Sequence, residues 1–253
     1  MRTAILLISS ALVCYAALCL ALFAFQRSLI YFPQPKSFGD AASTMRLAVE
    51  DAQLAITVRP HAGAKALIYF GGNAEDVSAN LASFSSAFPD YALYLMHYRG
   101  FGGSTGKPSE KLLHADATAL FDKVRGEHAD IALVGRSLGS GVAIRLATVR
   151  SASRLVLVTP YDSIEAIAAR QFPYFPVRWL LTDKFVSWRY AQAVRVPTLI
   201  LQAEIDDVIP AASTARLYAA FAPDTASLVV IRGAGHNSLS DTTQYLERMR
   251  SAL

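Results

Sequence analysis

The chain has 253 residues, enough for one large α/β domain or two small domains. Hydrophobic residues make up 53% of it and the mean hydropathy is +0.30, which is high for a soluble domain and indicates a membrane segment. The net charge of +4 comes from scattered lysines and arginines, a pattern that argues against nucleic acid as a partner. Both cysteines, Cys14 and Cys19, lie in the apolar N-terminal stretch, so the rest of the chain has no disulfide framework and no catalytic thiol.

Residues 4–25 form an uncharged apolar run that predicts a membrane-spanning helix. At 1.5 Å per residue the run is about 33 Å long, enough to cross the hydrocarbon core of a bilayer. A cleaved secretory signal is the alternative, but its hydrophobic region is normally about 7 to 15 residues long and ends at small residues. We therefore expect an uncleaved anchor over residues 1–28. Charge does not assign the side of the membrane, because Arg2 on one side is balanced by Arg27 and Lys36 on the other.

After a juxtamembrane connection over residues 26–40, short apolar runs alternate with amphipathic stretches. Two β-like runs at 45–49 and 53–58 predict a hairpin. The later apolar runs predict buried strands at 66–70, 91–96, 131–134, 155–158, 198–202 and 228–231. The stretches between them predict helices at 75–88, 109–126, 139–149, 213–221 and 242–249. This alternation is typical of a mainly parallel sheet with helices on both faces.

One interval, about residues 160–196, interrupts the alternation. It holds three helix-like stretches and both tryptophans of the chain, Trp179 and Trp188. An aromatic-rich insertion between two strands is a natural place for a cap over a site. Surface helices that bury their aromatic side chains against the sheet are the alternative interpretation, and the two are compatible.

Residues 135–139 read G-R-S-L-G and lie between a predicted strand and a predicted helix. In that context the G-x-S-x-G motif places its serine on a sharp strand-to-helix turn, with small residues where the backbone segments approach each other. Ser137 is therefore the candidate nucleophile. The backbone N–H of Leu138, at the start of the helix, points where an oxyanion would form. A glycine-rich turn without chemistry is the alternative.

A serine nucleophile needs an imidazole to take its proton and a carboxylate to orient that imidazole. With this motif the order along the chain is serine, acid, histidine. His236 is the only histidine after Ser137 and is the candidate base; a solvent-facing loop histidine is the alternative. The candidate acids lie in the loop after the strand at 198–202, and the residues alone do not choose among Glu204, Asp206 and Asp207.

The turn after the strand at 66–70 is expected to supply a second oxyanion donor. Residues 71–76 read G-G-N-A-E-D, and the glycines allow the backbone to approach a substrate carbonyl. The N-terminus of the helix predicted to follow favours negative charge. Neither this turn nor the glycine-rich stretch at 100–106 matches a phosphate-binding loop.

Taken in order, these motifs resemble the α/β-hydrolases, and more narrowly the N-terminally membrane-anchored serine hydrolases that include eukaryotic protein depalmitoylases and bacterial members. The motifs are GGNA at 71–74, YRGFGGS at 98–104, GRSLGSG at 135–141, AEIDDVIP at 203–210 and GHN at 235–237. The resemblance runs from about residue 29 to the C-terminus. It implies an α/β-hydrolase fold over residues 29–253, with a small helical cap.

The resemblance also implies roles for particular residues. It selects Asp206 as the acid, with Asp207 as the runner-up, and the backbone N–H groups of Asn73 and Leu138 as oxyanion donors. Three positions depart from the family pattern. Its usual His-Gly before the oxyanion residue is Gly71-Gly72, its usual aspartate before Tyr-Arg-Gly is His97, and the first glycine of its acid motif is Ala203.

The function expected is that of a membrane-anchored serine hydrolase that cleaves an ester, thioester or amide through an acyl-enzyme. No metal or organic cofactor is expected. The cap and the membrane tether favour an acyl-bearing or other carbonyl substrate. The alternative is a hydrolase-fold binding or scaffold module at the membrane with no turnover, which the departures at Gly71, His97 and Ala203 alone support.

Overall fold

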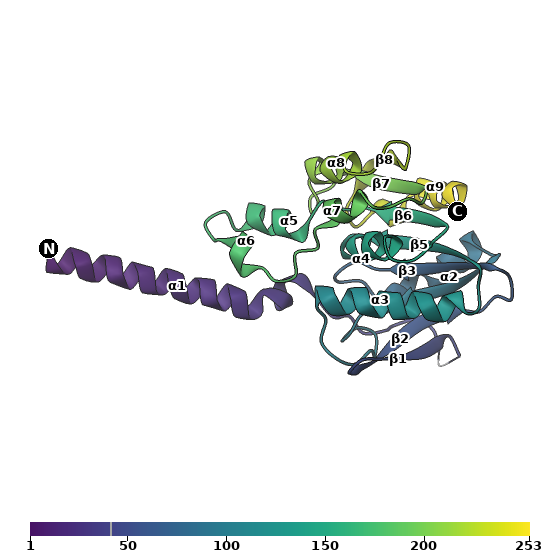
Figure 1. Cartoon of the computed structure of the whole chain (residues 1–253), viewed down its shortest axis with the longest axis horizontal. Helices are drawn as coiled ribbons and strands as arrows, with labels where there is room; N and C mark the ends of the chain where they lie inside the picture. The colour runs from purple at the N-terminus through teal and green to yellow at the C-terminus, as the bar shows by residue number, and fades with distance from the viewer. Residues whose placement is uncertain (41) are drawn as a thin grey trace.

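The computed structural model describes residues 1–40 and 42–253, which form one eight-stranded sheet with helices on both faces and a long helix that projects from it (Figure 1). The strands are β1 (Thr44–Val49), β2 (Ala52–Arg59), β3 (Lys65–Phe70), β4 (Tyr91–Met96), β5 (Asp130–Arg136), β6 (Arg154–Val158), β7 (Thr198–Ile205) and β8 (Ala226–Gly235). The α-helices are α1 (Arg2–Ile30), α2 (Leu81–Ala87), α3 (Glu110–Arg125), α4 (Leu138–Ala147), α5 (Ile164–Gln171), α6 (Val177–Leu180), α7 (Ser187–Ala191), α8 (Ala211–Ala219) and α9 (Thr243–Ala252). Two 3₁₀ turns, η1 (Val77–Asn80) and η2 (Leu239–Asp241), lie between them.

The sheet has the order β1-β2-β4-β3-β5-β6-β7-β8. The β1–β2 hairpin is antiparallel, as its two short β-like runs predict, and β2 also pairs with β4 antiparallel. Every pairing from β4 to β8 is parallel. The predicted mainly parallel sheet is confirmed, and its strands end at the same edge, where α/β proteins build their sites.

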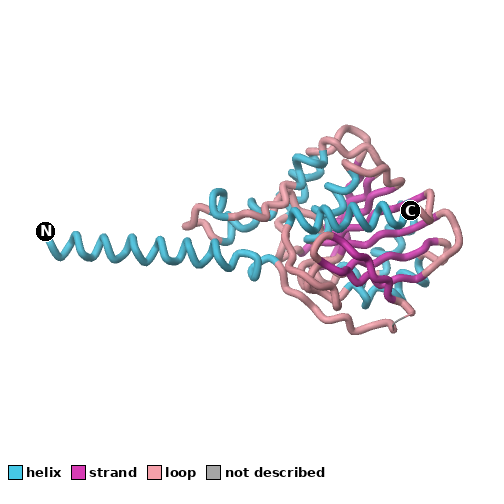
Figure 2. Tube along the Cα trace, turned by 60° about the horizontal axis from the view of Figure 1, so that its bottom comes forward, coloured by secondary structure: helices cyan, strands magenta, loops and turns pink. Residues whose placement is uncertain are grey.

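Each face of the sheet is covered by helices that bury an apolar side. One core packs α3, α4, α7 and α8 against the sheet, and the other packs α2 and α9 against the opposite face. Figure 2 shows α9, at the C-terminus, lying across the strands. The central strands are buried on both sides, which is why they read as continuous apolar runs in the sequence.

Several predicted element bounds differ from the structure: β7 and β8 are longer than the strands predicted at 198–202 and 228–231, and two further differences have identifiable causes. The helix predicted for residues 75–88 is shorter in the structure: it begins with η1 at Val77 and continues as α2 to Ala87. Glu75 and Asp76 lie outside it, because Glu75 folds back to accept the Gly72 N–H and Asp76 caps η1 by accepting the Ser78 N–H. The connection predicted from residue 26 begins in the structure after Ile30, because α1 continues five residues beyond the apolar run and packs there against the cap.

Helix α1 leaves the domain and projects away from the sheet (Figures 1 and 2). Within the described residues it is the one helix long and apolar enough to cross a membrane, and most of its side chains are exposed. Its last turns are tied to the cap. Gln26 donates to the Leu180 carbonyl at 3.2 Å and accepts from both the N–H and the hydroxyl of Thr182, at 2.7 and 2.8 Å.

The loop that follows β4 is fixed by a buried ion pair. The Arg99 guanidinium donates two 2.8 Å hydrogen bonds to the Asp116 carboxylate on α3, and both side chains are almost fully buried. Arg99 also donates to the Glu50 carbonyl at the β1–β2 turn. One side chain thus joins the loop, α3 and the hairpin.

We predict that Asp116→Ala lowers the free energy of unfolding by about 3 to 5 kcal/mol, because it leaves a buried guanidinium without a counter-ion. The matched control is Asp122→Ala, which breaks the exposed pair with Arg150 and should behave like wild type. Thermal unfolding of the detergent-solubilised full chain, followed by circular dichroism, measures both. Equal shifts in Tm for the two variants would contradict the role given to the Arg99–Asp116 pair.

His97, which replaces the family's usual aspartate, is buried and hydrogen-bonded through Nε2 to the Thr57 hydroxyl at 2.8 Å. Burial lowers the pKa of His97 to about 4; Lys36 and Arg46 act in the same direction, and Asp76 opposes them. In the unfolded chain a histidine has an ordinary pKa of about 6.5. Between about pH 4 and pH 6.5, His97 is therefore protonated in the unfolded chain and neutral in the folded chain.

The free energy of unfolding is therefore not reduced by His97 above about pH 6.5. As the pH falls from 6.5 toward 4, protonation of this histidine in the unfolded chain lowers the free energy of unfolding by about 3 kcal/mol. We predict that His97→Gln, which cannot titrate in this range, shows a smaller fall in Tm between pH 7 and pH 4 than wild type. The measurement is the same thermal unfolding at a series of pH values. Parallel Tm profiles would show that His97 does not carry this acid sensitivity.

Candidate active site

Ser137 lies on a strained turn between β5 and α4. Its backbone has φ 47° and ψ −117°, a conformation that residues other than glycine rarely adopt. The turn is tight because β5 and α4 nearly touch the end of β3. A Cβ on Gly139 would lie 2.1 Å from the Phe70 carbonyl oxygen, and one on Gly135 would lie 2.5 Å from the Gly139 carbonyl oxygen. The glycines of the motif are therefore required by space, as the sequence indicates.

His236 follows β8 directly and reaches the same edge of the sheet. Its Nε2 lies 3.0 Å from Ser137 Oγ, and both side chains are buried. Its Nδ1 lies 2.9 and 3.0 Å from the two carboxylate oxygens of Asp206. The structure therefore brings these three residues, which lie far apart in the sequence, into one hydrogen-bonded chain.

Among the three acids proposed from the sequence, Asp206 is the one that faces His236. Its carboxylate also accepts the N–H groups of Val208 and Ile209, at 2.9 and 2.7 Å. Burial by itself would raise the pKa of Asp206, but the hydrogen bonds from His236, Ile209 and Val208 outweigh it and lower the pKa below its usual value. The carboxylate is therefore ionised at neutral pH.

The other two acids are placed differently. Glu204 accepts the Gly233 N–H at 2.8 Å and so supports the loop that carries His236. Asp207 is exposed to solvent. Position in the loop, rather than residue type, separates Asp206 from its neighbours.

The two residues expected to bind an oxyanion through their backbone N–H groups line the same cavity as Ser137. Leu138 begins α4, and Asn73 lies in the turn after β3, where it lines the same cavity as Ser137. Among the described residues neither N–H donates to a protein acceptor. The preceding N–H, of Gly72, is taken by Glu75 at 2.7 Å, so it does not compete for this role.

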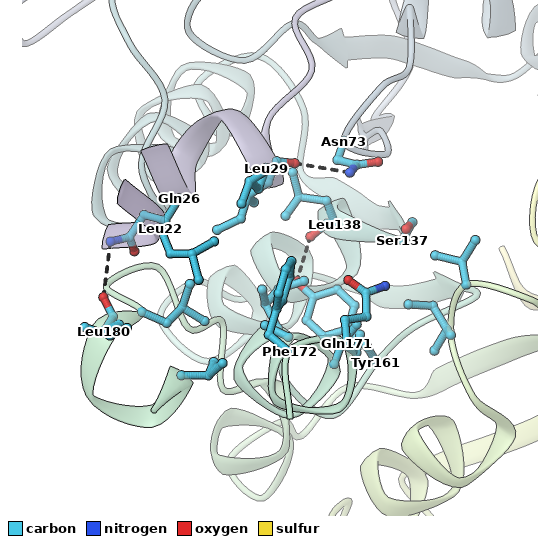
Figure 3. A pocket seen from close by; sticks show the side chains of 18 of the residues that line it. Leu22, Gln26, Leu29, Asn73, Ser137, Leu138, Tyr161, Gln171, Phe172 and Leu180 are labelled. Carbon is cyan, nitrogen blue, oxygen red and sulfur yellow. Dashed lines mark hydrogen bonds between the residues drawn. The ribbon is translucent and has the colours of Figure 1, made fainter. Parts of the chain in front are cut away.

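Asn73 is held by the end of α1. Its side-chain amide donates to the Ile30 carbonyl at 3.1 Å, and its own carbonyl accepts the Phe32 N–H at 2.9 Å (Figure 3). The predicted helix N-terminus directly behind this turn is absent, since η1 begins only at Val77. The position of Asn73 therefore depends on the N-terminal segment rather than on a helix behind it.

Sequence reasoning missed two residues that support the site. Glu75 accepts hydrogen bonds from Gly72, from the Tyr69 hydroxyl and from the Asn80 amide, each at 2.7 Å. Arg136, the second residue of the G-x-S-x-G motif, lies 3.5 Å from the Glu75 carboxylate and joins the turn after β3 to the serine turn. Their charges were visible in the sequence, but only the fold brings them together.

An apolar cavity of about 360 Å³ leads from Ser137 to the N-terminal helix. The cap supplies one wall, including Ile167, Phe172 and Leu180, and α1 supplies another with Leu22 and Leu29. Figure 3 shows these side chains around the cavity, with Ser137 and Asn73 at one end and Leu22 and Gln26 at the other. Within the interval 160–196, side chains between Tyr161 and Leu181 line this cavity together with Ser137.

Within residues 1–40 and 42–253, no group of three or more histidine, cysteine, aspartate or glutamate side chains is arranged to hold a metal ion. The polar groups around Ser137 are instead a base, a carboxylate and backbone donors. That arrangement can remove a proton from the serine hydroxyl and stabilise a negative oxygen next to it.

Comparison with known proteins gives the same picture of the fold. Residues 80–191 match a family described as "Serine aminopeptidase, S33". An uncharacterised protein of Mycobacterium tuberculosis (strain ATCC 25618 / H37Rv) is 35% identical over 246 residues, which cover 90% of this chain and 87% of that protein. The "alpha/beta hydrolase domain-containing protein aho-3" of Caenorhabditis elegans is 33% identical over 192 residues, or 73% of this chain and 56% of the relative.

Solved structures share the fold at lower identity. A Pyrococcus furiosus esterase superposes with a TM-score of 0.67 at 18% identity, covering 88% of this chain and 97% of the esterase. The sheet order, the turn at Ser137 and these relatives lead to one assignment. The chain belongs to the α/β-hydrolase superfamily.

Proposed function

We propose that this protein is a membrane-anchored serine hydrolase that cleaves an ester, thioester or amide bond of an acyl-bearing substrate. The observation that carries the proposal is the hydrogen-bonded chain from Ser137 through His236 to Asp206, at the end of an apolar cavity. A serine hydroxyl is a weak nucleophile by itself, and a buried imidazole oriented by an ionised carboxylate is what activates it.

In the proposed reaction, Ser137 Oγ attacks the substrate carbonyl carbon while His236 Nε2 takes the hydroxyl proton. The carbonyl oxygen becomes negative and accepts hydrogen bonds from the N–H groups of Asn73 and Leu138. When the intermediate collapses, the bond to the leaving group breaks and His236 gives that group the proton. Water, deprotonated by His236, then releases the acid from the acyl-enzyme.

The cavity supports an acyl group as the part of the substrate that is recognised. Its walls are mainly aliphatic and aromatic, so a hydrocarbon chain would replace water there at a gain in free energy. Val208, beside Asp206, is one of the lining residues at the Ser137 end of the cavity and is partly exposed. We place the leaving group on that open side and the acyl chain in the cavity.

We further propose that residues 1–28 are retained as a membrane anchor and that residues 29–253 form the hydrolase domain, with the cap at about 160–196. A cleaved signal is the alternative. One observation supports the anchor: Leu22 and Gln26 of α1 line the cavity, and both lie within residues 1–28. Cleavage near the end of the apolar run would remove part of the site.

A binding or scaffold module without turnover is the competing function. The departures at Gly71, His97 and Ala203 are its support in the sequence. A Cβ at Gly71 would lie 2.5 Å from Val77 Cγ1, His97 is buried against Thr57, and Ala203 is buried in β7. None of these three residues belongs to the hydrogen-bonded chain of Ser137, His236 and Asp206.

The proposed role of Ser137 as the nucleophile can be tested with a reagent that labels activated serines. The purified protein exposed to a fluorophosphonate probe should gain the mass of one adduct, whereas Ser137→Ala and His236→Ala should gain none, as measured by intact-mass spectrometry. Turnover of an activated ester should fall by about 10⁴-fold or more in either variant. Wild-type protein that remains unlabelled would instead favour the scaffold function.

The proposed role of Asp206 as the acid can be tested against its neighbour Asp207. Asp206→Asn should lower kcat for the same ester by about 10³- to 10⁴-fold, because an amide in that position can hold the wrong tautomer of His236. The matched control is Asp207→Asn, one residue away and exposed, which should keep a kcat close to wild type. If instead the Asp207 variant lost activity and the Asp206 variant kept it, Asp207 would be the acid.

A further inference from the structure

One face of α1 lies along the cap far beyond the juxtamembrane turn. Tyr15, Cys19, Leu22, Gln26 and Ile30 recur every three or four residues, so they share one side of the helix. At its far end, Tyr15 stacks on Phe175 with ring centroids 5.7 Å apart, and its hydroxyl donates to the Tyr174 carbonyl at 2.8 Å. Figure 1 shows α6 beside the C-terminal half of α1, away from the sheet.

This contact fixes how deep the cap lies if α1 crosses a bilayer. The apolar run ends at Phe25, and Tyr15 lies about 15 Å along the helix from Phe25. Half of a hydrocarbon core is about 15 Å thick. The residues that touch Tyr15 are therefore at the depth of lipid chains, not of water.

The surface of the cap suits that position. Tyr174 and Trp179 are 85% and 84% exposed, an unusual state for large aromatic side chains in water. The stretch 166–182 contains no acidic residue, and its only charges are Arg170 and Arg178. Long arginine side chains can extend to lipid phosphates while aromatic rings lie among the chains below them.

The cavity connects this part of the cap with Ser137. Leu29 lines the cavity and is also 51% exposed, so the cavity wall reaches the protein surface at α1. An acyl chain that lies in the leaflet next to Leu22 therefore has an apolar path past Leu29 toward the serine. It needs no passage through water.

We propose that the tip of the cap is embedded, beside α1, in the leaflet nearer to the hydrolase domain and that the cavity takes an acyl chain sideways from that leaflet. The ligand is a membrane-resident acyl chain joined to its head group by an ester or thioester. The hydrolysis of that bond rests on the function proposed above, whereas the insertion of the cap does not.

The two tryptophans test the insertion without any catalysis. Trp188→Phe leaves Trp179, at the tip of the cap, as the only tryptophan, and Trp179→Phe leaves Trp188, in α7 over the sheet. The full chain of each variant is reconstituted in phosphatidylcholine vesicles whose acyl chains carry bromine. Trp179 fluorescence should be quenched by the bromolipid, and Trp188 fluorescence should respond to aqueous acrylamide and not to bromine. Quenching of Trp179 by acrylamide alone would overturn the insertion.

A pair of variants on α1 tests the route. Leu22→Trp narrows the cavity, while Leu20→Trp adds the same bulk on the opposite, 67% exposed face of the helix. The readout is the ratio of turnover of 4-nitrophenyl palmitate dissolved in vesicles to that of water-soluble 4-nitrophenyl butyrate. The ratio should fall at least tenfold in Leu22→Trp and match wild type in Leu20→Trp. Equal ratios in all three proteins would overturn the route.

Two further arms identify where the chain comes from. Palmitate released from labelled phosphatidylcholine points to a lipid, and palmitate released from an S-palmitoyl peptide in the same vesicles points to a protein. Failure of the two proposals is distinguishable. Bromine quenching of Trp179 in a protein that takes no fluorophosphonate would support the insertion of the cap and reject the hydrolase function. Fluorophosphonate labelling of a protein whose Trp179 is not quenched by bromine would support the hydrolase function and reject the insertion.

Discussion

The geometry of the site depends on the close crossing of β5, α4 and β3. The chain turns sharply from β5 into α4 at Ser137, and this turn requires the positive φ of that residue. The close packing at the turn leaves no space for a Cβ at Gly135 or Gly139. The cost of the strained backbone is met by the packing of buried β5 and α4 around it. The same turn places the hydroxyl at the edge of the sheet, within reach of His236, and leaves the Leu138 N–H without a protein partner in the described chain.

Around that turn, the site is assembled from loops at the ends of parallel strands. Asp206 follows β7 and His236 follows β8, and the two strands pair directly, so their loops meet. Glu75 and Arg136 fix the opposite side by joining the turn after β3 to the serine turn. The sheet thus sets the coarse positions, and a few buried hydrogen bonds set the final ones.

Much of the fold could be predicted from the sequence because buried parallel strands are continuous apolar runs with little ambiguity. The serine and histidine could also be predicted, since the elbow needs glycines at fixed positions and His236 is the only histidine after it. The choice of Asp206 over Asp207 could not be made from the residues alone, because adjacent aspartates in a loop differ only in where their side chains point. The extension of α1 to Ile30 was missed because Gln26 is polar, yet it is buried by partners in the cap that lie some 154 residues away.

The hydrogen bond from Asn73 to Ile30 makes the site dependent on the end of α1. Through Ile30 and Phe32, the N-terminal segment positions one of the backbone groups beside the serine, and through Leu22 and Leu29 it closes the cavity. If α1 anchors the chain as proposed, a copy released by a cut between Leu22 and Leu29 would lose Leu22 from the cavity wall, together with the helical turns that precede Leu29 and Ile30. Activity would then be confined to intact copies at the bilayer, with no need for a separate inhibitor to silence those that escape.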